Sequence, residues 1–122
     1  MKLSDIGKSL GLEELTPALG AGSDVEVAGA HASDLLSDVL ANAPSGGVLL
    51  TIQVHMNVVA VALHAGLKAV IFTSGMTPEE AVRSKAAGEN IRLYAAREAT
   101  FDVAGKLYAL GLRGGRPERG LK

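Results

Sequence analysis

Residues 47–75 read GVLLTIQVHMNVVAVALHAGLKAVIFTSG and contain two short apolar runs with a helix-like stretch between them. Residues 48–52 and 68–72 are nearly continuous in apolar side chains, which is typical of strands that are covered on both faces. Residues 57–65 are rich in Val and Ala, and Gly66 follows them as a helix stop. A strand, a helix and a second strand in this order predict a parallel β-α-β unit with a right-handed crossover.

The same alternation continues on both sides of this unit. Residues 25–28 (VEVA) alternate between apolar and polar side chains and predict a strand, and residues 33–42 have the spacing of an amphipathic helix. Residues 77–87 begin with TPEE, a capping box with proline at the first helical position, and predict a second helix. A strand over 91–95 and a helix over 100–110 complete the series.

The amino-terminal residues add one helix and one short strand. Ser4 is placed to cap a helix that ends at Gly11, and residues 12–16 predict a strand that stops at Pro17. From residue 25 onward, strands alternate with helices over short turns, which is typical of a parallel sheet. We therefore predict an α/β fold of three layers, α/β/α, with a mostly parallel sheet of about four strands and helices on both of its faces.

The length of 122 residues is enough for one domain with a core of its own. The last ten residues, RGGRPERGLK, carry four basic side chains, three glycines and one proline, with no periodicity. Such a composition does not bury enough apolar surface to order a segment. We therefore expect a single domain over residues 1–112 and a flexible basic tail over residues 113–122.

The composition excludes several classes of protein. The chain has no cysteine, which excludes disulfides, thiolate metal sites and a cysteine nucleophile. Its net charge of −1 and its lack of Trp argue against nucleic acid as a partner. No apolar run approaches the ~20 residues that span a bilayer, and residues 1–5 lack the apolar segment of a secretion signal. We expect a cytoplasmic protein that binds neither nucleic acid nor a membrane.

The predicted topology indicates where a ligand would bind. In open parallel sheets, ligands bind at the carboxyl ends of the strands, where the loops meet helix N-termini whose free N–H groups favour phosphate or carboxylate. This rule selects four loops, over residues 29–33, 53–57, 73–77 and 96–100. The candidate ligand-binding residues in three of them are Gly29, His31, Ser33, Gln53, His55, Asn57, Thr73, Ser74 and Gly75.

Each candidate group also has a purely structural interpretation. Hydroxyl side chains directly before helices serve equally well as N-caps, and these are Ser33, Thr77 and Thr100. The polar residues Gln53, His55 and Asn57 are spaced two apart and face one way if the strand continues in extended form. They either hold a ligand or fix a turn and cap the next helix. His31 either joins the same site or is a solvated loop residue.

Metal and catalytic signatures are weak in this sequence. Asp34 and Asp38 lie four residues apart on a predicted helix face, where they either assist a divalent cation or are simply solvated. The histidines have no close spacing, and His64 suits a helix C-terminus. There is no GxxxxGK[ST] phosphate loop, no GxGxxG after the first strand, no HExxH and no GxSxG. We therefore predict a protein that is not an enzyme and has no cofactor.

The chain resembles the DRTGG domain, a small α/β domain similar to the amino-terminal domain of HPr kinase/phosphorylase. The resemblance rests on residues 47–75 together with SDVEVAGAHASDLLSDVLANA, TPEEAVRSKAAGENIRLYAA and TFDVAGKLYALG. The signature region corresponds to residues 24–30, where Val25 replaces a basic residue and Ala28 and Ala30 replace Thr and Gly. The resemblance implies a three-layer fold and a regulatory or ligand-sensing role beside a partner enzyme.

Three functional hypotheses follow, from different classes. The first is a non-catalytic regulatory module that binds a small anionic or nucleotide-like ligand at the carboxyl ends of the strands. The second is a homodimeric interaction module that packs through Ala- and Gly-rich faces such as residues 58–65 or 86–88. The third is an HPr-kinase-like phosphotransfer protein that uses His55 with Asp34 as its partner.

Overall fold

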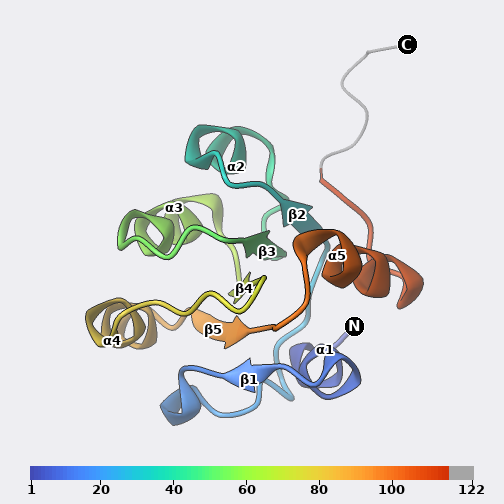
Figure 1. Ribbon diagram of the computed structural model, residues 1–122, viewed down its shortest axis with the longest axis horizontal. Coiled ribbons are helices and arrows are strands. Elements are labelled where there is room, and N and C mark those ends of the chain that lie inside the picture. The colour runs from blue at the N-terminus through green and yellow to red at the C-terminus, as the bar shows by residue number, and fades with distance from the viewer. Residues whose placement is uncertain (116–122) are drawn as a thin grey trace.

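Four strands run parallel through the middle of the fold, and a very short fifth strand pairs antiparallel with one edge (Figure 1). The computed structural model describes residues 1–115. The sheet order is β1-β5-β4-β3-β2. The strands are β1 (Glu13–Glu14), β2 (Ala30–Ala32), β3 (Val48–Thr51), β4 (Ala69–Phe72) and β5 (Arg92–Ala95). The predicted mostly parallel α/β sheet is confirmed, with β1 as its antiparallel addition.

Helices cover both faces of the sheet, as predicted. They are α1 (Leu3–Leu10), the 3-10 turn η1 (Pro17–Leu19), α2 (Leu36–Asn42), α3 (Asn57–Ala65), α4 (Glu80–Gly88) and α5 (Thr100–Ala109). The crossover helices α2, α3 and α4 share one core with the sheet, and α1 and α5 share the core on the opposite face. Among residues 1–115, no helix is both long and apolar enough to cross a membrane.

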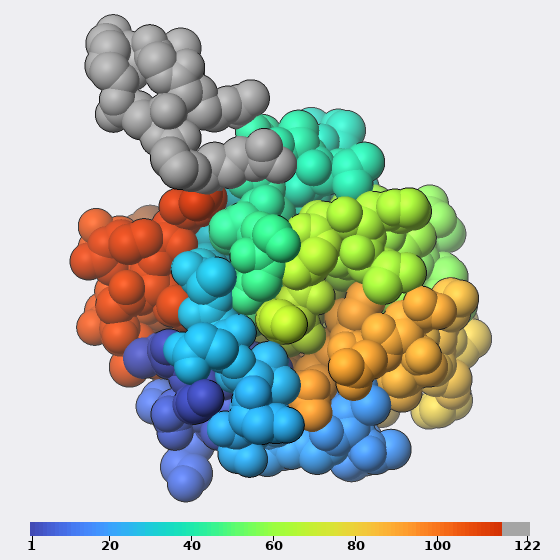
Figure 2. Space-filling view, turned by 180° about the vertical axis from the view of Figure 1, so that it is seen from behind, coloured from blue at the N-terminus to red at the C-terminus, as the bar shows by residue number. Residues whose placement is uncertain are grey.

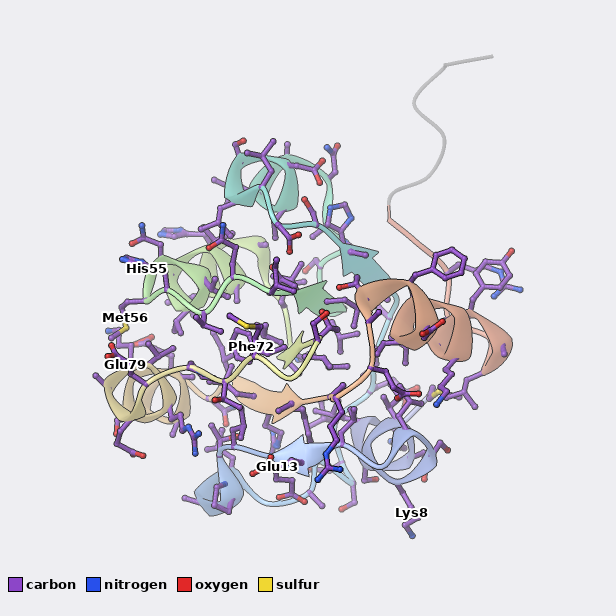
Figure 3. All side chains as sticks on the ribbon, in the orientation of Figure 1. Lys8, Glu13, His55, Met56, Phe72 and Glu79 are labelled. Carbon is purple, nitrogen blue, oxygen red and sulfur yellow. The ribbon has the colours of Figure 1, made fainter. Side chains whose placement is uncertain are left out.

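Strand β4 shows why the central strands are apolar at every position. Val70 and Phe72 pack in the core beneath the crossover helices (Phe72 is labelled in Figure 3), whereas Ala69 and Ile71 pack in the core beneath α1 and α5. All four side chains are 0% exposed. Because successive side chains of a strand point to opposite faces, a strand between two helix layers needs apolar residues on both.

The central β3-α3-β4 unit forms within one residue of its sequence prediction. α3 ends at Gly66, which takes the left-handed conformation with φ +73° and donates its N–H to Leu63 O at 3.1 Å. The carbonyl of Gly66 accepts a hydrogen bond from Gly46 N at 2.7 Å, which fixes the return of the chain into β4. This conformation is strained for any residue with a Cβ, so glycine is required here.

Helices α2 and α4 begin later than predicted. Ser33 N donates to Leu50 O, which extends the pairing beside β3, so α2 starts only at Leu36. Glu79 is still extended, with φ −67° and ψ 162°, so α4 starts at Glu80 and Thr77 lies too far away to cap it. The predicted capping box at residues 77–80 is therefore wrong: the N-terminus of α4 has no side-chain cap.

The first parallel strand lies later than predicted, over residues 30–32 instead of 25–28. Residues 25–28 pair with the amino-terminal residues, because Leu3 N donates to Val25 O and Val27 N donates to Met1 O, both at 2.9 Å. The two segments lie side by side in Figure 2. The alternation of residues 25–28 therefore reflects the burial of Val27 under this pairing rather than a place in the main ladder.

The predicted tail begins with residues that contact the sheet. Ala30 N, at the free edge of β2, donates to Arg113 O at 3.0 Å, and Gly114 continues this contact as an isolated parallel bridge. The guanidinium of Arg113 stacks on the ring of Tyr108, 3.6 Å from its centroid. The remainder of the predicted tail, residues 116–122, lies outside the described residues.

Candidate functional site

The loops that follow β4 and β5 lead to opposite faces of the sheet. The chain leaves β4 for α4, which lies with α2 and α3, but it leaves β5 for α5 on the other face (Figure 1). Between two neighbouring parallel strands whose loops diverge in this way, a crevice opens at the carboxyl ends, and ligands of open α/β sheets bind there. The topology therefore selects the β4–β5 edge as the candidate site.

A cavity of about 710 Å³ lies at this position. Three segments line it, and they are Leu10, Gly11 and Glu13 at the end of α1 and the start of β1, Gly75 and Thr77 after β4, and residues 95–98 at the end of β5. Its volume falls in the range of roughly 300–1,000 Å³ that is typical of small-molecule sites. The antiparallel strand β1 thus contributes one wall of the cavity, because Glu13 pairs with Ala95.

Backbone hydrogen bonds hold the two loops of the crevice together. Ser74 N donates to Glu98 O at 2.7 Å, and Gly75 N donates to Ala96 O at 2.9 Å. The buried hydroxyl of Thr73 contacts that of Thr100 at 2.5 Å, which ties β4 to the first residue of α5. These bonds fix the shape of the crevice without using a side chain that lines the cavity.

The two residues at the tip of the β4–α4 loop both have left-handed backbone conformations. Ser74 has φ +59° and Gly75 has φ +73°. The conformation of Ser74 is unfavourable for a residue with a Cβ, and such positions occur often in ligand-binding loops. A Cβ added to Gly75 would meet nothing within 4 Å, so the backbone angle, and not lack of space, favours glycine there.

The charged side chains around the cavity differ in how they are paired. Arg97 is exposed and makes no hydrogen bond or ion pair with any other residue of the range 1–115. Glu98 is neutralised by an ion pair with Lys106 of α5. Glu13 on the β1 wall is exposed and has no cationic partner within the same range. The cavity therefore presents one uncommitted cation and one uncommitted carboxylate.

The polar residues after β3 do not line this cavity. The strand ends at Thr51, so Gln53, His55 and Asn57 do not continue it in extended form. Gln53 Nε2 donates to Asp34 O at 3.2 Å, and His55 Nδ1 accepts from Asn57 N at 3.1 Å. All three are exposed, and His55 lies at the outer end of α3 (Figure 3). Their hydrogen bonds fix the turn before α3, but the predicted side-chain cap is absent, because the N-cap residue Met56 makes no side-chain hydrogen bond to the helix.

Ser33 and Asp34 hold the turn after β2. Ser33 Oγ accepts from Leu35 N at 3.1 Å. Asp34 Oδ1 accepts from Thr51 Oγ1 and from Ile52 N, both at 2.9 Å, and thereby joins the ends of β2 and β3. Asp34 precedes α2, so it does not share a helix face with Asp38 as the sequence predicted.

His31 and Gly29 lie away from the cavity. His31 is in β2, and its Nε2 lies 2.8 Å from Asp38 Oδ2. Hydrogen bonds from Asn42 first, and then from His31 and Ser33, lower the pKa of Asp38 to about 2. Gly29 precedes β2 and is thus at the amino end of the sheet, where an added Cβ would lie 2.8 Å from Arg113 O. Close packing, rather than a place at the carboxyl edge, accounts for this glycine.

The structure thus gathers only part of the predicted set at the crevice. Thr73, Ser74 and Gly75 form the β4 side of it, and of the nine candidates only Gly75 lines the cavity. Sequence reasoning selected the loop of residues 96–100 but named only Thr100 in it, as a helix cap, so Arg97 was missed. An arginine two residues beyond an apolar strand was the available signal. Within residues 1–115, no three metal-ligating side chains come together.

Comparison with known proteins gives a likeness in fold and not in sequence. No family model matches the chain, and no curated protein matches it either. A solved structure with a similar fold contains the CBS and DRTGG domains of the regulatory region of Clostridium perfringens pyrophosphatase, complexed with its activator diadenosine tetraphosphate. It matches with a TM-score of 0.66 over 85% of this chain at 14% identity.

This likeness shows that the chain shares the fold of part of a structure that contains CBS and DRTGG domains. The chain spans 44% of the length of that structure. At 14% identity the comparison establishes the fold alone. It agrees with the five-stranded, mostly parallel sheet covered by helices on both faces.

Proposed function

We propose that this chain is a non-catalytic, ligand-sensing regulatory module, and that it binds a small anionic or nucleotide-like ligand in the cavity at the carboxyl ends of β4 and β5. The observation that carries the proposal is Arg97, an uncommitted guanidinium on the wall of a cavity of about 710 Å³ at the divergence of the two loops. Guanidinium groups bind phosphate and carboxylate oxygens through paired, charge-assisted hydrogen bonds.

The other uncommitted groups favour a ligand with more than one chemical end. The exposed Thr77 hydroxyl lies on the α4 side of the cavity and donates to no other residue of the described chain. Together with Arg97, it supplies donors for an anion. Glu13 on the opposite wall repels a second anionic group but accepts hydrogen bonds from amino or hydroxyl groups. A nucleotide, with phosphate at one end and hydroxyl and amino groups at the other, meets both requirements.

The geometry favours binding over catalysis. His55 Nδ1 accepts from Asn57 N, and Asp34 Oδ1 accepts from two donors at the end of β3. These bonds hold each residue in its local turn, and among residues 1–115 no hydrogen bond or ion pair joins His55 to Asp34, as a phosphotransfer pair would require. The fold likeness to a pyrophosphatase regulatory region supports a regulatory role, and we propose a separate enzyme as the partner that receives the signal.

Binding is tested with a panel of ligands on the full chain: ATP, ADP, AMP, diadenosine tetraphosphate, pyrophosphate and phosphate. A ligand at 100 times its Kd stabilises the folded protein by about 2.7 kcal/mol. For a domain of this size, that is a rise in the melting temperature of roughly 10 °C. We expect at least one nucleotide to produce a shift of this order, with a smaller effect of phosphate alone.

Arg97→Ala is the decisive variant, and Lys68→Ala is its matched control. Lys68 is also exposed and basic, but it precedes β4 at the amino end of the sheet. Loss of a charge-assisted bond of about 1.5–3 kcal/mol weakens binding roughly 10- to 100-fold. We expect this loss in Arg97→Ala and wild-type affinity in Lys68→Ala, measured by calorimetry. Equal affinities in all three proteins, or no binding of any ligand, would refute the proposal.

A further inference from the structure

Helix α5 carries an exposed aromatic pair on its outer surface. The side chain of Phe101 is 86% exposed, and that of Tyr108, two turns later, is 60% exposed. The chain has only two phenylalanines, and the other, Phe72, is fully buried. A large aromatic side chain left almost entirely in water loses the stabilisation that its burial would bring. These two exposed aromatic side chains are therefore typical of a surface that contacts a partner.

Gly105 lies between the two aromatic residues, one turn from each. It is in the interior of α5, and a Cβ added to it would meet nothing within 4 Å. Its φ is not in the left-handed region, so neither space nor backbone angle within this chain requires glycine. Apart from proline, glycine is the residue least favourable to a helix interior. Glycine at this exposed position leaves room for another backbone to approach closely.

We infer that this α5 surface, formed by Phe101, Gly105 and Tyr108, binds α5 of a second copy of the chain in an antiparallel arrangement. Phe101 precedes Gly105 by four residues, and Tyr108 follows it by three. A two-fold axis near Gly105 therefore places Phe101 of each copy against Tyr108 of the other, which is the self-complementary pairing that a symmetric dimer requires. Aromatic pairs of this kind prefer offset or edge-to-face contact.

The charges on α5 favour the same arrangement. Asp102 is in the first turn of the helix, and Lys106, which also pairs with Glu98 of its own chain, is in the last turn. Arg113 stacks on Tyr108, beyond the end of the helix. In an antiparallel pair, Asp102 of one copy faces the basic half of the other, and the opposite ends of the two helix dipoles lie together. In a parallel pair, like charges would face each other.

The exposed area indicates the strength of this dimer. A Phe or Tyr side chain buries roughly 150–250 Å² when fully covered, so the exposed parts of the two aromatics offer about 300 Å² per copy. A stable interface buries about 800 Å² per partner, so this pair supplies the centre of an interface and not all of it. We therefore expect a weak, reversible dimer, whose formation is independent of whether the ligand site is occupied.

Sedimentation equilibrium of the full chain from 1 µM to 1 mM tests the inference. We expect a monomer–dimer equilibrium and at least a 30-fold rise in the dimer Kd for Phe101→Ser. Leu63→Ser, which removes another half-exposed apolar side chain on the opposite helix layer, serves as the control and should leave Kd unchanged. A monomer at all concentrations, or a dimer equally strong in Phe101→Ser, would overturn the inference.

The absence of cysteine from the chain permits a second, geometric test. A disulfide forms only when the two Cα atoms are about 4.4–6.8 Å apart. In Gly105→Cys, a covalent dimer should therefore form under mild oxidation only if the two α5 helices meet at this position. Ala60→Cys, at an exposed position of α3, is the control and should remain monomeric. Equal cross-linking at both positions would contradict the proposed packing.

Discussion

The hydroxyl of Tyr94 gives the sharpest prediction about stability. Tyr94 is 2% exposed, and its hydroxyl is buried without a hydrogen-bond partner among the described residues. The ring itself packs well, with its edge 3.6 Å from where a Cβ on Gly7 of α1 would lie. A buried hydroxyl without a partner is unfavourable by about 1–3 kcal/mol. Tyr94→Phe keeps the ring and removes this penalty, so we expect it to stabilise the protein by about 1 kcal/mol.

The effect of Tyr94→Phe should also grow at alkaline pH. Burial first, and then the negative charge of Glu14, raise the pKa of Tyr94 in the folded protein. The unfolded chain ionises near the usual pKa of about 10. The contribution of the protonated Tyr94 hydroxyl to the stability of the wild type is therefore fully present below about pH 10, and it is lost as the pH rises toward the pKa of Tyr94 in the folded protein. Because phenylalanine does not ionise, the difference between the two proteins should widen above pH 10.

Urea unfolding followed by circular dichroism measures both effects. At pH 7, a gain of about 1 kcal/mol raises the urea midpoint, and in a parallel thermal scan it corresponds to a rise in melting temperature of about 4 °C. Tyr108→Phe is the matched control, since Tyr108 is 60% exposed and its ring would keep the stacking of Arg113. A loss of stability of 1 kcal/mol or more in Tyr94→Phe at pH 7 would refute the reasoning, because it would mean that the hydroxyl has a favourable partner.

Two further predictions concern an ionised network and a helix end. The hydrogen bond from Asn42 is the chief cause that holds the pKa of Asp38 at about 2, so the ionised carboxylate contributes stability that is fully present above about pH 4 and is lost as the pH falls through about 2. In Asp38→Asn, the urea midpoint should therefore change less between pH 4 and pH 2 than in the wild type. The same dependence of the midpoint on pH in both proteins would contradict this. Gly66→Ala forces an alanine into φ +73° with its Cβ 2.7 Å from Ser45 Oγ, and should destabilise by about 1–2 kcal/mol in thermal unfolding. Gly88→Ala, at the last residue of α4 and with open space around it, is the control and should be neutral or stabilising.

The central β-α-β unit could be predicted from sequence because its signals are local. The apolar runs of β3 and β4 have a helix layer on each face, and Gly66 ends α3 through its own backbone angle. Residues 25–28 misled the prediction because their alternation is real but comes from pairing with residues 1–3. Nothing within either segment indicates that pairing, which joins residues more than twenty positions apart.

The candidate site was predictable only in its location at the carboxyl edge. The rule for open sheets selects four loops. Which two neighbouring loops diverge, and so open a crevice, depends on the position of α5 on the opposite face of the sheet from α4. The cavity wall formed by residues 10–13 depends in addition on the antiparallel pairing of Glu13 with Ala95. The polar residues Gln53, His55 and Asn57 were predicted to share a site because of their spacing, yet their hydrogen bonds hold the local turn before α3.

The most direct test of the proposed ligand site is a nitrogen–proton correlation NMR titration of the full chain with the nucleotide that gives the largest thermal shift. The amide signals of residues that line the cavity, above all Gly11, Gly75, Thr77 and Arg97, should move together with one Kd. The signals of His55 and Asn57, at the end of α3, should remain in place. Shifts confined to the His55–Asn57 turn, or no shifts at the cavity at saturating ligand, would contradict a binding site between β4 and β5.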